Sequence, residues 1–292
     1  MKESLPLLFP MKMKNKMFKI NNNEELLLLT KASGKSKEWL LAHPEYKNFW
    51  VLLKYKYYLK KLNQNVPMAY ILGHKEFFSL DFLVNKYTLI PRPDTEILVD
   101  ETIKEISNIQ YSISNILMID IGTGTGCIPI TILKKLKDLK ITAIATDISK
   151  GALKVARKNA KKHKVKINFL HGDLLSPIFK SFNLAIFESL IITANLPYLK
   201  EEWWKNEPSI QQEPKSALVS DDKNGLELYE KLLQQIIEIK KILDIEYWIF
   251  LEIDPRQSSE IFPLIQKYLP EASIEIVKDL SDFDRVVKIK IF

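Results

Sequence analysis

A turn with three glycines in five residues, Gly122-Thr123-Gly124-Thr125-Gly126, is the sequence feature that most limits the fold. It directly follows an apolar run at 116–121 that is typical of a buried strand, and it directly precedes a helical pattern at 127–136. Glycines let a backbone turn tightly and approach a ligand closely. A strand, a glycine-rich turn and a helix in this order predict the start of an α/β sheet with a ligand bound at the turn.

Strand-like and helical segments alternate through the rest of the chain. We expect strands at 116–121, 141–146, 167–171, 183–194, 247–253, 273–277 and 285–291. We expect helices from Thr95 to about 106 and at 127–136, 149–163, 225–242 and 257–268. This alternation predicts an open α/β sheet of seven strands with helices on both faces. Because no helical pattern separates the last two strands, we expect the final strand to enter the sheet antiparallel.

The first third of the chain has a different pattern. Residues 1 to about 20 look frayed, and helical patterns at 24–29, 36–41 and 46–62 predict a small helical unit that Pro67 ends. Two strand-like runs follow, Tyr70 to Gly73 and Phe77 to Val84, and they predict a β-hairpin bridge to the sheet.

Length and composition bound the class of protein. A chain of 292 residues has room for one large domain and one small one. Cys127 is the only cysteine, which excludes an internal disulfide and favours a reducing compartment, and four scattered histidines give no metal site. The chain shows neither a signal peptide nor a membrane span, so we expect a cytoplasmic protein. The net charge of +7 comes from lysine clusters that we assign to solvated helix faces, because no aromatic residues alternate with them.

Three carboxylates lie at or directly after the carboxyl ends of the first three expected strands of the sheet. Asp120, two residues before the first glycine, can hold an ammonium group such as that of a methionine moiety. Asp147 is placed to accept both ribose hydroxyls, and its alternative role is a helix N-cap. Asp173 can accept an adenine amino proton while Leu174 packs on the ring, and its alternative is a turn aspartate. Together with the glycine-rich turn, these residues favour a nucleoside cofactor that carries an amino acid.

Asn195-Leu196-Pro197-Tyr198 ends the fourth expected strand, where a methionine-bearing nucleoside cofactor would present its methyl group. The Asn195 side-chain oxygen and the Leu196 backbone carbonyl can accept the two N–H bonds of a planar NH2 group, and Tyr198 can stack on it. Pro197 would stiffen the turn. The alternative is an ordinary Asn-x-Pro loop with a core tyrosine. Combined with the upstream turn, the motif predicts methyl transfer to an amide or amino nitrogen.

Over most of its length the chain resembles the HemK/PrmC family of protein-glutamine methyltransferases. The motifs that carry the resemblance are Tyr70-Ile71-Leu72-Gly73 with Glu76-Phe77, Leu89-Ile90-Pro91-Arg92-Pro93-Asp94-Thr95-Glu96, the turn from Asp120 to Gly126, Asp147, Asp173-Leu174, Glu213-Pro214-Lys215-Ser216-Ala217-Leu218, Gly225-Leu226 with Tyr229, Leu251-Glu252-Ile253 and Asp284-Arg285-Val286-Val287. The segment from Leu89 to Glu96 matches the family's most specific signature.

The resemblance implies a class I (Rossmann-like) methyltransferase sheet of seven strands and a small N-terminal helical domain, joined by a β-hairpin linker. It places a substrate-recognition domain at 1–68, the linker at 69–92 and the methyltransferase domain at 93–292. It implies that S-adenosyl-L-methionine donates a methyl group to the glutamine of the Gly-Gly-Gln loop in class 1 peptide-chain release factors. We expect a monomer that acts on a protein, without direct contact to nucleic acid.

Site residues are carried over position by position. The catalytic set is Asn195, Leu196, Pro197 and Tyr198. The cofactor-binding set is Asp120, Gly122, Thr123, Gly124, Thr125, Gly126, Asp147, Asp173, Leu174 and Asn195.

The chain departs from the family pattern at two positions, and the first of them resembles another class of methyltransferase. The family usually has proline at position 196, whereas Asn-Leu-Pro-Tyr also resembles the motif of ribosomal-RNA adenine dimethylases. Asn183 stands where the family has an aspartate. The competing hypotheses are methylation of an adenine amino group in RNA or DNA, which requires an extruded base, and a non-catalytic cofactor-binding module.

Overall fold

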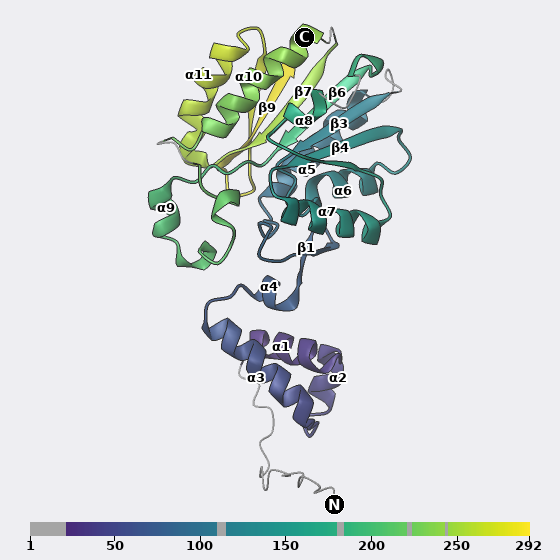
Figure 1. The fold of residues 1–292 in the computed structure, drawn as a ribbon, viewed down its shortest axis with the longest axis vertical. Helices are drawn as coiled ribbons and strands as arrows, with labels where there is room; N and C mark the ends of the chain where they lie inside the picture. Colours follow the sequence, from purple (N-terminus) through teal and green to yellow (C-terminus); the bar gives the residue numbers. More distant parts are fainter. Residues whose placement is uncertain (1–21, 110–114, 180–183, 221–223, 243–244) are drawn as a thin grey trace, which may run out of the picture. The chain divides into compact units, whose positions relative to one another are not determined.

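The computed structural model describes residues 22–109, 115–179, 184–220, 224–242 and 245–292 (Figure 1). The chain divides into two compact units, Met1–Leu72 and Gly73–Phe292. Two expectations, the frayed segment at 1 to about 20 and the departure at Asn183, fall outside the described residues.

The described part of the first unit is helical. Its elements are α1 (Asn23–Ser33), α2 (Lys37–Ala42), α3 (Phe49–Asn63) and α4 (Met68–Leu72). Asn22, Ser36 and Asn48 cap the first three helices, because each side chain accepts a hydrogen bond from a backbone N–H of the first turn. The core of the unit consists of small and aliphatic side chains with one tyrosine: Leu26, Leu28, Leu29, Ala32, Leu40, Val51, Tyr55 and Ile71.

The segment from Tyr70 to Gly73 is not the strand that the sequence suggested. Residues 68–72 form α4, and the carbonyl of Pro67 accepts hydrogen bonds from Tyr70 and Ile71 at 2.9 and 3.1 Å. Proline fits the first turn of a helix because it lacks only an N–H that would have no partner there. Pro67 therefore precedes a further short helix, which ends at Leu72 and is followed by Gly73 with a φ of 82°.

The expected hairpin does form, with its first strand shifted. It pairs β1 (His74–Phe77) with β2 (Leu80–Leu83) antiparallel. Its two turn residues, Phe78 and Ser79, both have positive φ. The backbone N–H of Phe78 donates to the Glu96 carboxylate at 2.7 Å, so the last residue of the 89–96 segment holds this turn.

The second unit contains the expected α/β sheet of seven strands. The strands are β3 (Ile116–Ile121), β4 (Ile141–Asp147), β5 (Asn168–His171), β6 (Ser189–Ala194), β7 (Tyr247–Glu252), β8 (Ser273–Lys278) and β9 (Asp284–Ile291). Their order is β5-β4-β3-β6-β7-β9-β8, and β3 pairs parallel with β4 and β6. The last strand, β9, pairs antiparallel with both β7 and β8, as the sequence predicted.

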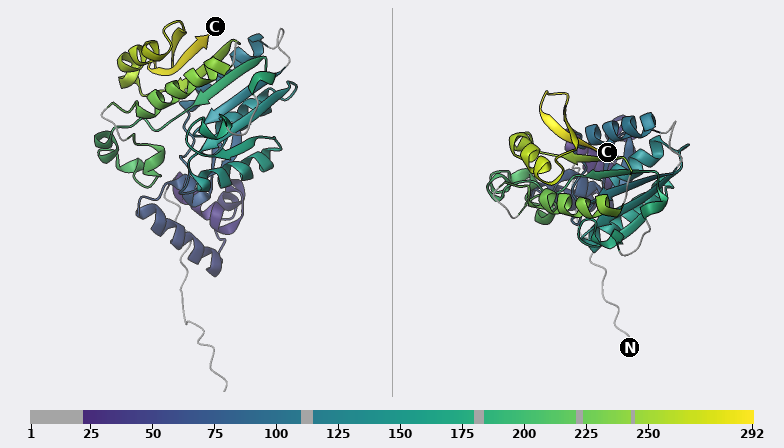
Figure 2. Two further views of the ribbon diagram at one scale, coloured as in Figure 1. Left: turned by 45° about the horizontal axis from the view of Figure 1, so that its top comes forward. Right: turned by 90° about the horizontal axis from the view of Figure 1, so that it is seen from above.

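Helices cover both faces of this sheet (Figures 1 and 2). One face packs against α5 (Thr95–Ile109), α6 (Cys127–Lys135) and α7 (Lys150–His163), in a core that includes Met118 and Phe250. The other face packs against α8 (Ser176–Phe179), α10 (Glu227–Ile242) and α11 (Ser258–Tyr268), in a core that includes Leu117 and Ile249. Neighbouring residues of one strand thus enter different cores, as strand geometry requires.

Three connections differ from expectation. Strand β6 begins at Ser189 rather than near 183, because a 3-10 turn, η1 (Leu184–Ile186), closes with the Phe187 N–H on the Leu184 carbonyl at 3.2 Å. Between β6 and α10 lie three short elements that the sequence did not suggest, α9 (Glu201–Lys205), η2 (Pro208–Ile210) and η3 (Lys215–Ala217), and η4 (Pro255–Gln257) precedes α11. Within the described ranges, no helix has the length and apolar character that crossing a bilayer requires.

Candidate active site

A cavity of about 580 Å³ in the second unit lies at the carboxyl ends of β3, β4, β5 and β6. We call it the larger cavity. Its wall includes most residues of the glycine-rich turn and the residues that follow the next three strands. Ligands bind at this edge in open parallel sheets. Most of the sequence-predicted cofactor residues therefore meet at one place, although they come from four separate segments.

The glycine-rich turn is held by buried polar contacts. Asn159 of α7 is fully buried, and its Nδ2 donates to the carbonyls of Thr125 and Leu83 at 2.9 and 3.0 Å. Gly126 has a φ of 79°, and a Cβ there would lie 3.0 Å from Ile130 Cδ1. This position thus needs glycine to allow α6 to start directly after the turn.

Asp147 ends β4 and lies in the wall of the larger cavity with only 9% of its surface exposed. Its Oδ2 accepts the Gly124 N–H at 2.9 Å and its Oδ1 accepts the Ser149 N–H at 2.7 Å. Burial raises the pKa of the carboxyl, while these two hydrogen bonds lower it. The N-cap of α7 is Ser149, which accepts from Ala152, so capping this helix is not the role of Asp147. Each carboxylate oxygen keeps a free lone pair for a ligand hydroxyl.

Asp173 and Leu174 lie in the wall of the larger cavity after β5. Asp173 is exposed, and its backbone carbonyl closes a turn with Ser176 at 3.0 Å. Leu174 is buried and has a φ of 47°. Ile148 also lines this wall although 68% of its surface is exposed. Ile148 was not predicted from the sequence. An apolar residue directly after the strand-ending Asp147 is the pattern that could have indicated it.

Asp120 lies behind the wall and not in it. It is fully buried, and its Oδ1 accepts the hydroxyl of Thr193, its register partner on β6, at 2.7 Å. Its Oδ2 has no hydrogen-bond partner among the described residues. Burial raises the pKa of Asp120 to about 7. Direct contact between Asp120 and a methionine ammonium group stays a prediction.

Asn195 and Leu196 border two cavities. They line the larger cavity and also a second one of about 250 Å³, which we call the smaller cavity. Pro197 lines only the larger cavity and Tyr198 only the smaller one. The rest of the smaller cavity is mostly apolar, with contributions from Leu89, Pro93, Leu199, Ile210, Ala217 and Leu218 beside Arg92 and Asp94.

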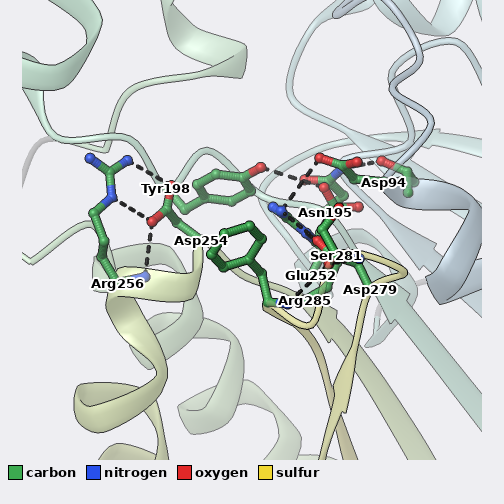
Figure 3. Close-up of polar contacts among 11 residues, drawn as sticks. Asp94, Asn195, Tyr198, Glu252, Asp254, Arg256, Asp279, Ser281 and Arg285 are labelled. Carbon is green, nitrogen blue, oxygen red and sulfur yellow. Dashed lines mark hydrogen bonds and ion pairs between the residues drawn. The ribbon is translucent and has the colours of Figure 1, made fainter.

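Figure 3 shows the polar groups around Asn195 and Tyr198. The Asn195 Nδ2 donates to the Thr95 hydroxyl at 3.1 Å, and the Tyr198 hydroxyl donates to Glu252 Oε1 at 3.4 Å. Glu252 is almost fully buried, and burial raises its pKa to about 7. The Thr95 hydroxyl and the positive charge of Arg285 lower that pKa. Arg285 is itself paired with Asp279 at 3.0 Å and Asp94 at 3.5 Å.

A buried ion pair joins two parts of the cavity wall that lie far apart in the sequence. The Arg92 guanidinium pairs with Glu213, which is 5% exposed, and the second Glu213 oxygen accepts the Ile90 N–H at 2.9 Å. This contact fixes the 89–96 segment to the loop that begins at Glu213. The ion pair gives a structural reason for the presence of the 89–96 segment and the 213–218 motif in one chain.

The structure thus brings most of the predicted site residues together. Asp120, Gly126 and Tyr198 stand outside the wall of the larger cavity. Sequence reasoning assigned no role to Thr95, Asn159, Tyr229 or Glu252. The available signal for Glu252 was a single carboxylate at the end of the apolar run Tyr247 to Leu251.

Sequence comparison relates the chain to known methyltransferases. The model of the family described as "Methyltransferase small domain" matches residues 99–189. The chain is 32% identical over 232 residues to the release factor glutamine methyltransferase of Bacillus anthracis, covering 79% of this chain and 78% of the relative. It is 36% identical over 230 residues to that of Enterococcus faecalis, covering 78% and 77%.

A third relative covers more of the chain. The release factor glutamine methyltransferase of Buchnera aphidicola is 32% identical over 268 residues, which are 91% of this chain and 90% of the relative. Among solved structures, the hMettl16 catalytic domain in complex with a MAT2A 3'UTR hairpin matches with a TM-score of 0.55 at 16% identity, covering 74% of this chain and 75% of that chain. At this low identity the match concerns the fold alone.

Proposed function

Because the chain belongs to the family of release factor glutamine methyltransferases, we propose that its own substrate is the Gly-Gly-Gln glutamine of a class 1 peptide-chain release factor. The chain is a methyltransferase that uses S-adenosyl-L-methionine. The proposed reaction forms a bond between the methyl carbon and the side-chain amide nitrogen. The bond between sulfur and the methyl group breaks, and its electron pair stays on sulfur.

The larger cavity has the chemistry that this cofactor requires. Its volume of about 580 Å³ lies within the usual range of small-molecule sites. Asp147 offers two acceptor oxygens for the ribose hydroxyls, and Gly124 already fixes one of those oxygens. Ile148 and Leu174 offer apolar side chains to the adenine ring. When bound, the cofactor supplies an electrophilic methyl group.

The observation that carries the proposal is the position of Asn195 and Leu196 in the walls of both cavities. A cofactor in the larger cavity and a glutamine side chain in the smaller one would meet at these two residues. The smaller cavity, at about 250 Å³, is matched to one side chain, and its walls are mostly apolar. This arrangement supports an acceptor that enters from the side opposite to the cofactor.

The protein's contribution to the chemistry is orientation. An amide nitrogen is a weak nucleophile because its lone pair is delocalised into the carbonyl. In the proposed complex, the Asn195 side-chain oxygen and the Leu196 carbonyl accept the two amide N–H bonds and hold the nitrogen toward the methyl group. As the new bond forms, the nitrogen becomes acidic and releases one proton to water, so no strong base is needed.

We also propose the helical first unit as the part that recognises the release factor. Along α3 it exposes three aromatic side chains and a leucine, with exposed fractions of 50% for Phe49, 70% for Trp50, 45% for Leu53 and 55% for Tyr57. Exposed apolar groups of this kind mark protein contacts. We propose further that the chain acts as a monomer, without direct contact to nucleic acid, in a reducing compartment that suits its free Cys127.

Incubation with S-adenosyl-L-methionine tests the proposed function. One reaction contains a recombinant release factor, a second contains the same factor with its Gly-Gly-Gln glutamine replaced by alanine, and a third contains structured RNA. Peptide mass spectrometry of the first two reactions should find one added methyl group on the glutamine and none in the alanine variant, and nucleoside mass spectrometry of the third should find no methylated adenine. Methylation of adenine in the RNA, with an unmodified release factor, would contradict the proposal and favour the adenine hypothesis.

A further inference from the structure

Glu252 lies directly beside the strand end that carries Asn195. Strands β6 and β7 are parallel neighbours with Ala194 opposite Leu251. The residues that follow this pair are Asn195, directly after β6, and Glu252, the last residue of β7. Glu252 is only 1% exposed and lines neither cavity. Its Oε2 has no close hydrogen-bond partner among the described residues. A buried carboxyl with so few partners is costly to the fold, which calls for a role beyond stability.

The first link from Glu252 to the site runs through Thr95. The Thr95 hydroxyl accepts the Asn195 Nδ2–H at 3.1 Å and hydrogen-bonds to the Glu252 carboxyl. A hydroxyl has one proton to donate, and the ionised form of the Glu252 carboxyl, which predominates above its pKa of about 7, can only accept. The Thr95 hydroxyl therefore directs its proton toward Glu252, and its oxygen lone pairs are left to accept an N–H from Asn195. This order turns the NH2 of Asn195 away from the acceptor and leaves its Oδ1 free.

The second link runs through Tyr229 of α10, which is fully buried. Its hydroxyl accepts the Leu196 N–H at 3.3 Å and donates to the backbone carbonyl of Glu252. Burial raises the pKa of Tyr229 far above its ordinary value, so the hydroxyl keeps its proton. Leu196 has an N–H to offer, whereas a proline at this position would have none. This bond fixes the peptide plane before the Leu196 carbonyl.

A third contact is direct. The Tyr198 hydroxyl donates to Glu252 Oε1 at 3.4 Å, which ties the ring at the smaller cavity to the same carboxyl (Figure 3). Asn195 is thus linked to Glu252 through Thr95, and Leu196 is linked to it through Tyr229. Tyr198 contacts Glu252 directly.

We propose that Glu252 is a positioning residue for the acceptor amide: its carboxyl acts through the Thr95 hydroxyl on the Asn195 side-chain oxygen, and its backbone carbonyl acts through the Tyr229 hydroxyl on the peptide that precedes the Leu196 carbonyl. This inference rests on the proposed function, because it assigns those two oxygens to the acceptor nitrogen. Glu252 touches neither substrate nor cofactor in this role. Its effect should fall on kcat and leave cofactor affinity unchanged.

The Thr95 link is tested with three matched variants. Thr95→Val removes the hydroxyl at nearly constant shape, and Thr95→Ser retains it. Thr102→Val removes a hydroxyl from the same helix, where Thr102 is fully buried and donates only to the Leu98 carbonyl at 2.7 Å. Thr95→Val should lower kcat by about 100-fold, the cost of a small misplacement of reacting groups. Thr95→Ser should recover most of the loss, and Thr102→Val should leave kcat unchanged.

The Tyr229 and Glu252 groups are tested in the same assay. Tyr229→Phe should lower kcat. Tyr247→Phe removes a buried hydroxyl that has no hydrogen-bond partner in the described ranges, and it should leave kcat unchanged. Glu252→Gln keeps the shape of the side chain, but its NH2 can donate to the Thr95 hydroxyl. The Thr95 hydroxyl can then direct its own proton toward Asn195 and no longer requires an N–H from it. Glu252→Gln should lower kcat without lowering the free energy of unfolding. Equal kcat for wild type and Glu252→Gln would overturn the proposal, as would equal losses in Thr95→Ser and Thr95→Val.

A measurement that needs no turnover separates this inference from the proposed function. In nitrogen-15-labelled protein, the side-chain NH2 signal of Asn195 is identified by its absence in Asn195→Ala. Thr95→Val and Glu252→Gln should shift this signal, and Thr102→Val should not. If wild type fails to methylate the release factor but the shift is seen, the proposed function fails and the positioning of Asn195 stands. An unshifted signal in Thr95→Val overturns the inference whatever the activity.

Discussion

The two cavities that meet at Asn195 are built in different ways. The larger cavity is shaped by backbone, since positive-φ glycines, strand ends and the N–H groups of Gly124 and Ser149 place its one buried carboxylate, Asp147. The orientation of Asn195 and Tyr198 at the smaller cavity depends on side-chain contacts between distant parts of the sequence. Thr95 and Asn195 are 100 positions apart, and Tyr198 and Glu252 are 54 apart.

This difference indicates how each side should respond to mutation. A backbone-built site tolerates changes that keep its turns, and it loses affinity when the single carboxylate is removed. A site built from a series of side-chain contacts should lose orientation when any one of them is removed, while the fold and the cofactor remain bound. Mutations on the two sides should therefore separate cofactor affinity from turnover.

The largest expected effect is that of Asn195→Ala. It should lower kcat by about 10²–10³-fold, the loss seen when one oriented polar group is removed from an active site. Cofactor affinity, measured by titration calorimetry, should stay close to wild type, because Asn195 orients the acceptor. Asn206→Ala, an exposed asparagine at the end of α9, is the control. Parallel losses in cofactor affinity and single-turnover rate would show that the two sides are not separate.

Asp147→Ala should have the reverse effect. Each charge-assisted hydrogen bond to a ribose hydroxyl is worth about 1.5–3 kcal/mol, so cofactor affinity should fall at least tenfold. At saturating cofactor, kcat should fall much less than affinity does. Titration of wild type and variant with the cofactor checks this. Unchanged affinity combined with lower stability would mean that Asp147 only holds the Gly124 and Ser149 N–H groups.

The same contrast explains what could be predicted from the sequence. The strands, the antiparallel β9 and the residues of the larger cavity follow from contiguous patterns such as the turn at 122–126. Thr95 and Glu252 could not be assigned a role in this way, because their contacts depend on the order of strands in space. The error at Tyr70 to Gly73 was local, since an apolar run after Pro67 suits a short helix as well as a strand.

Leu196→Pro should have a moderate effect on the smaller cavity. Proline keeps the carbonyl at 196 and loses the N–H that donates to Tyr229 at 3.3 Å. The ring restrains the backbone in place of that hydrogen bond, so kcat should stay within about tenfold, or about 1.4 kcal/mol of barrier. Tyr229→Phe should cost less in this background than in wild type, which a double-mutant cycle measures. Methylation of nucleic acid in place of release factor by either form would contradict the assignment.

The smallest expected effect is on stability and concerns Asp120, which lies behind the wall of the larger cavity. Burial raises the pKa of Asp120 to about 7. Between the unfolded pKa near 3.9 and about 7, the folded protein binds more protons than the unfolded chain, so the free energy of unfolding falls as pH rises through this window. Urea midpoints measured across it should fall less in Asp120→Asn. The control is Asp138→Asn, an exposed carboxyl, and equal slopes for Asp120→Asn and wild type would contradict the burial effect.

Strand β9 is made last of the seven, yet it lies between β7 and β8. During synthesis, the glycine-rich turn, Asn195 and Glu252 all emerge before Arg285, whose charge lowers the pKa of Glu252. At roughly 5–20 residues per second, the nascent chain spends a few seconds with β7 present and β9 not yet made. The larger cavity can thus form before β9 is made, whereas the contacts around Glu252 at the smaller cavity need β9. Methylation should therefore begin only after the β9 segment has been synthesised and inserted into the sheet.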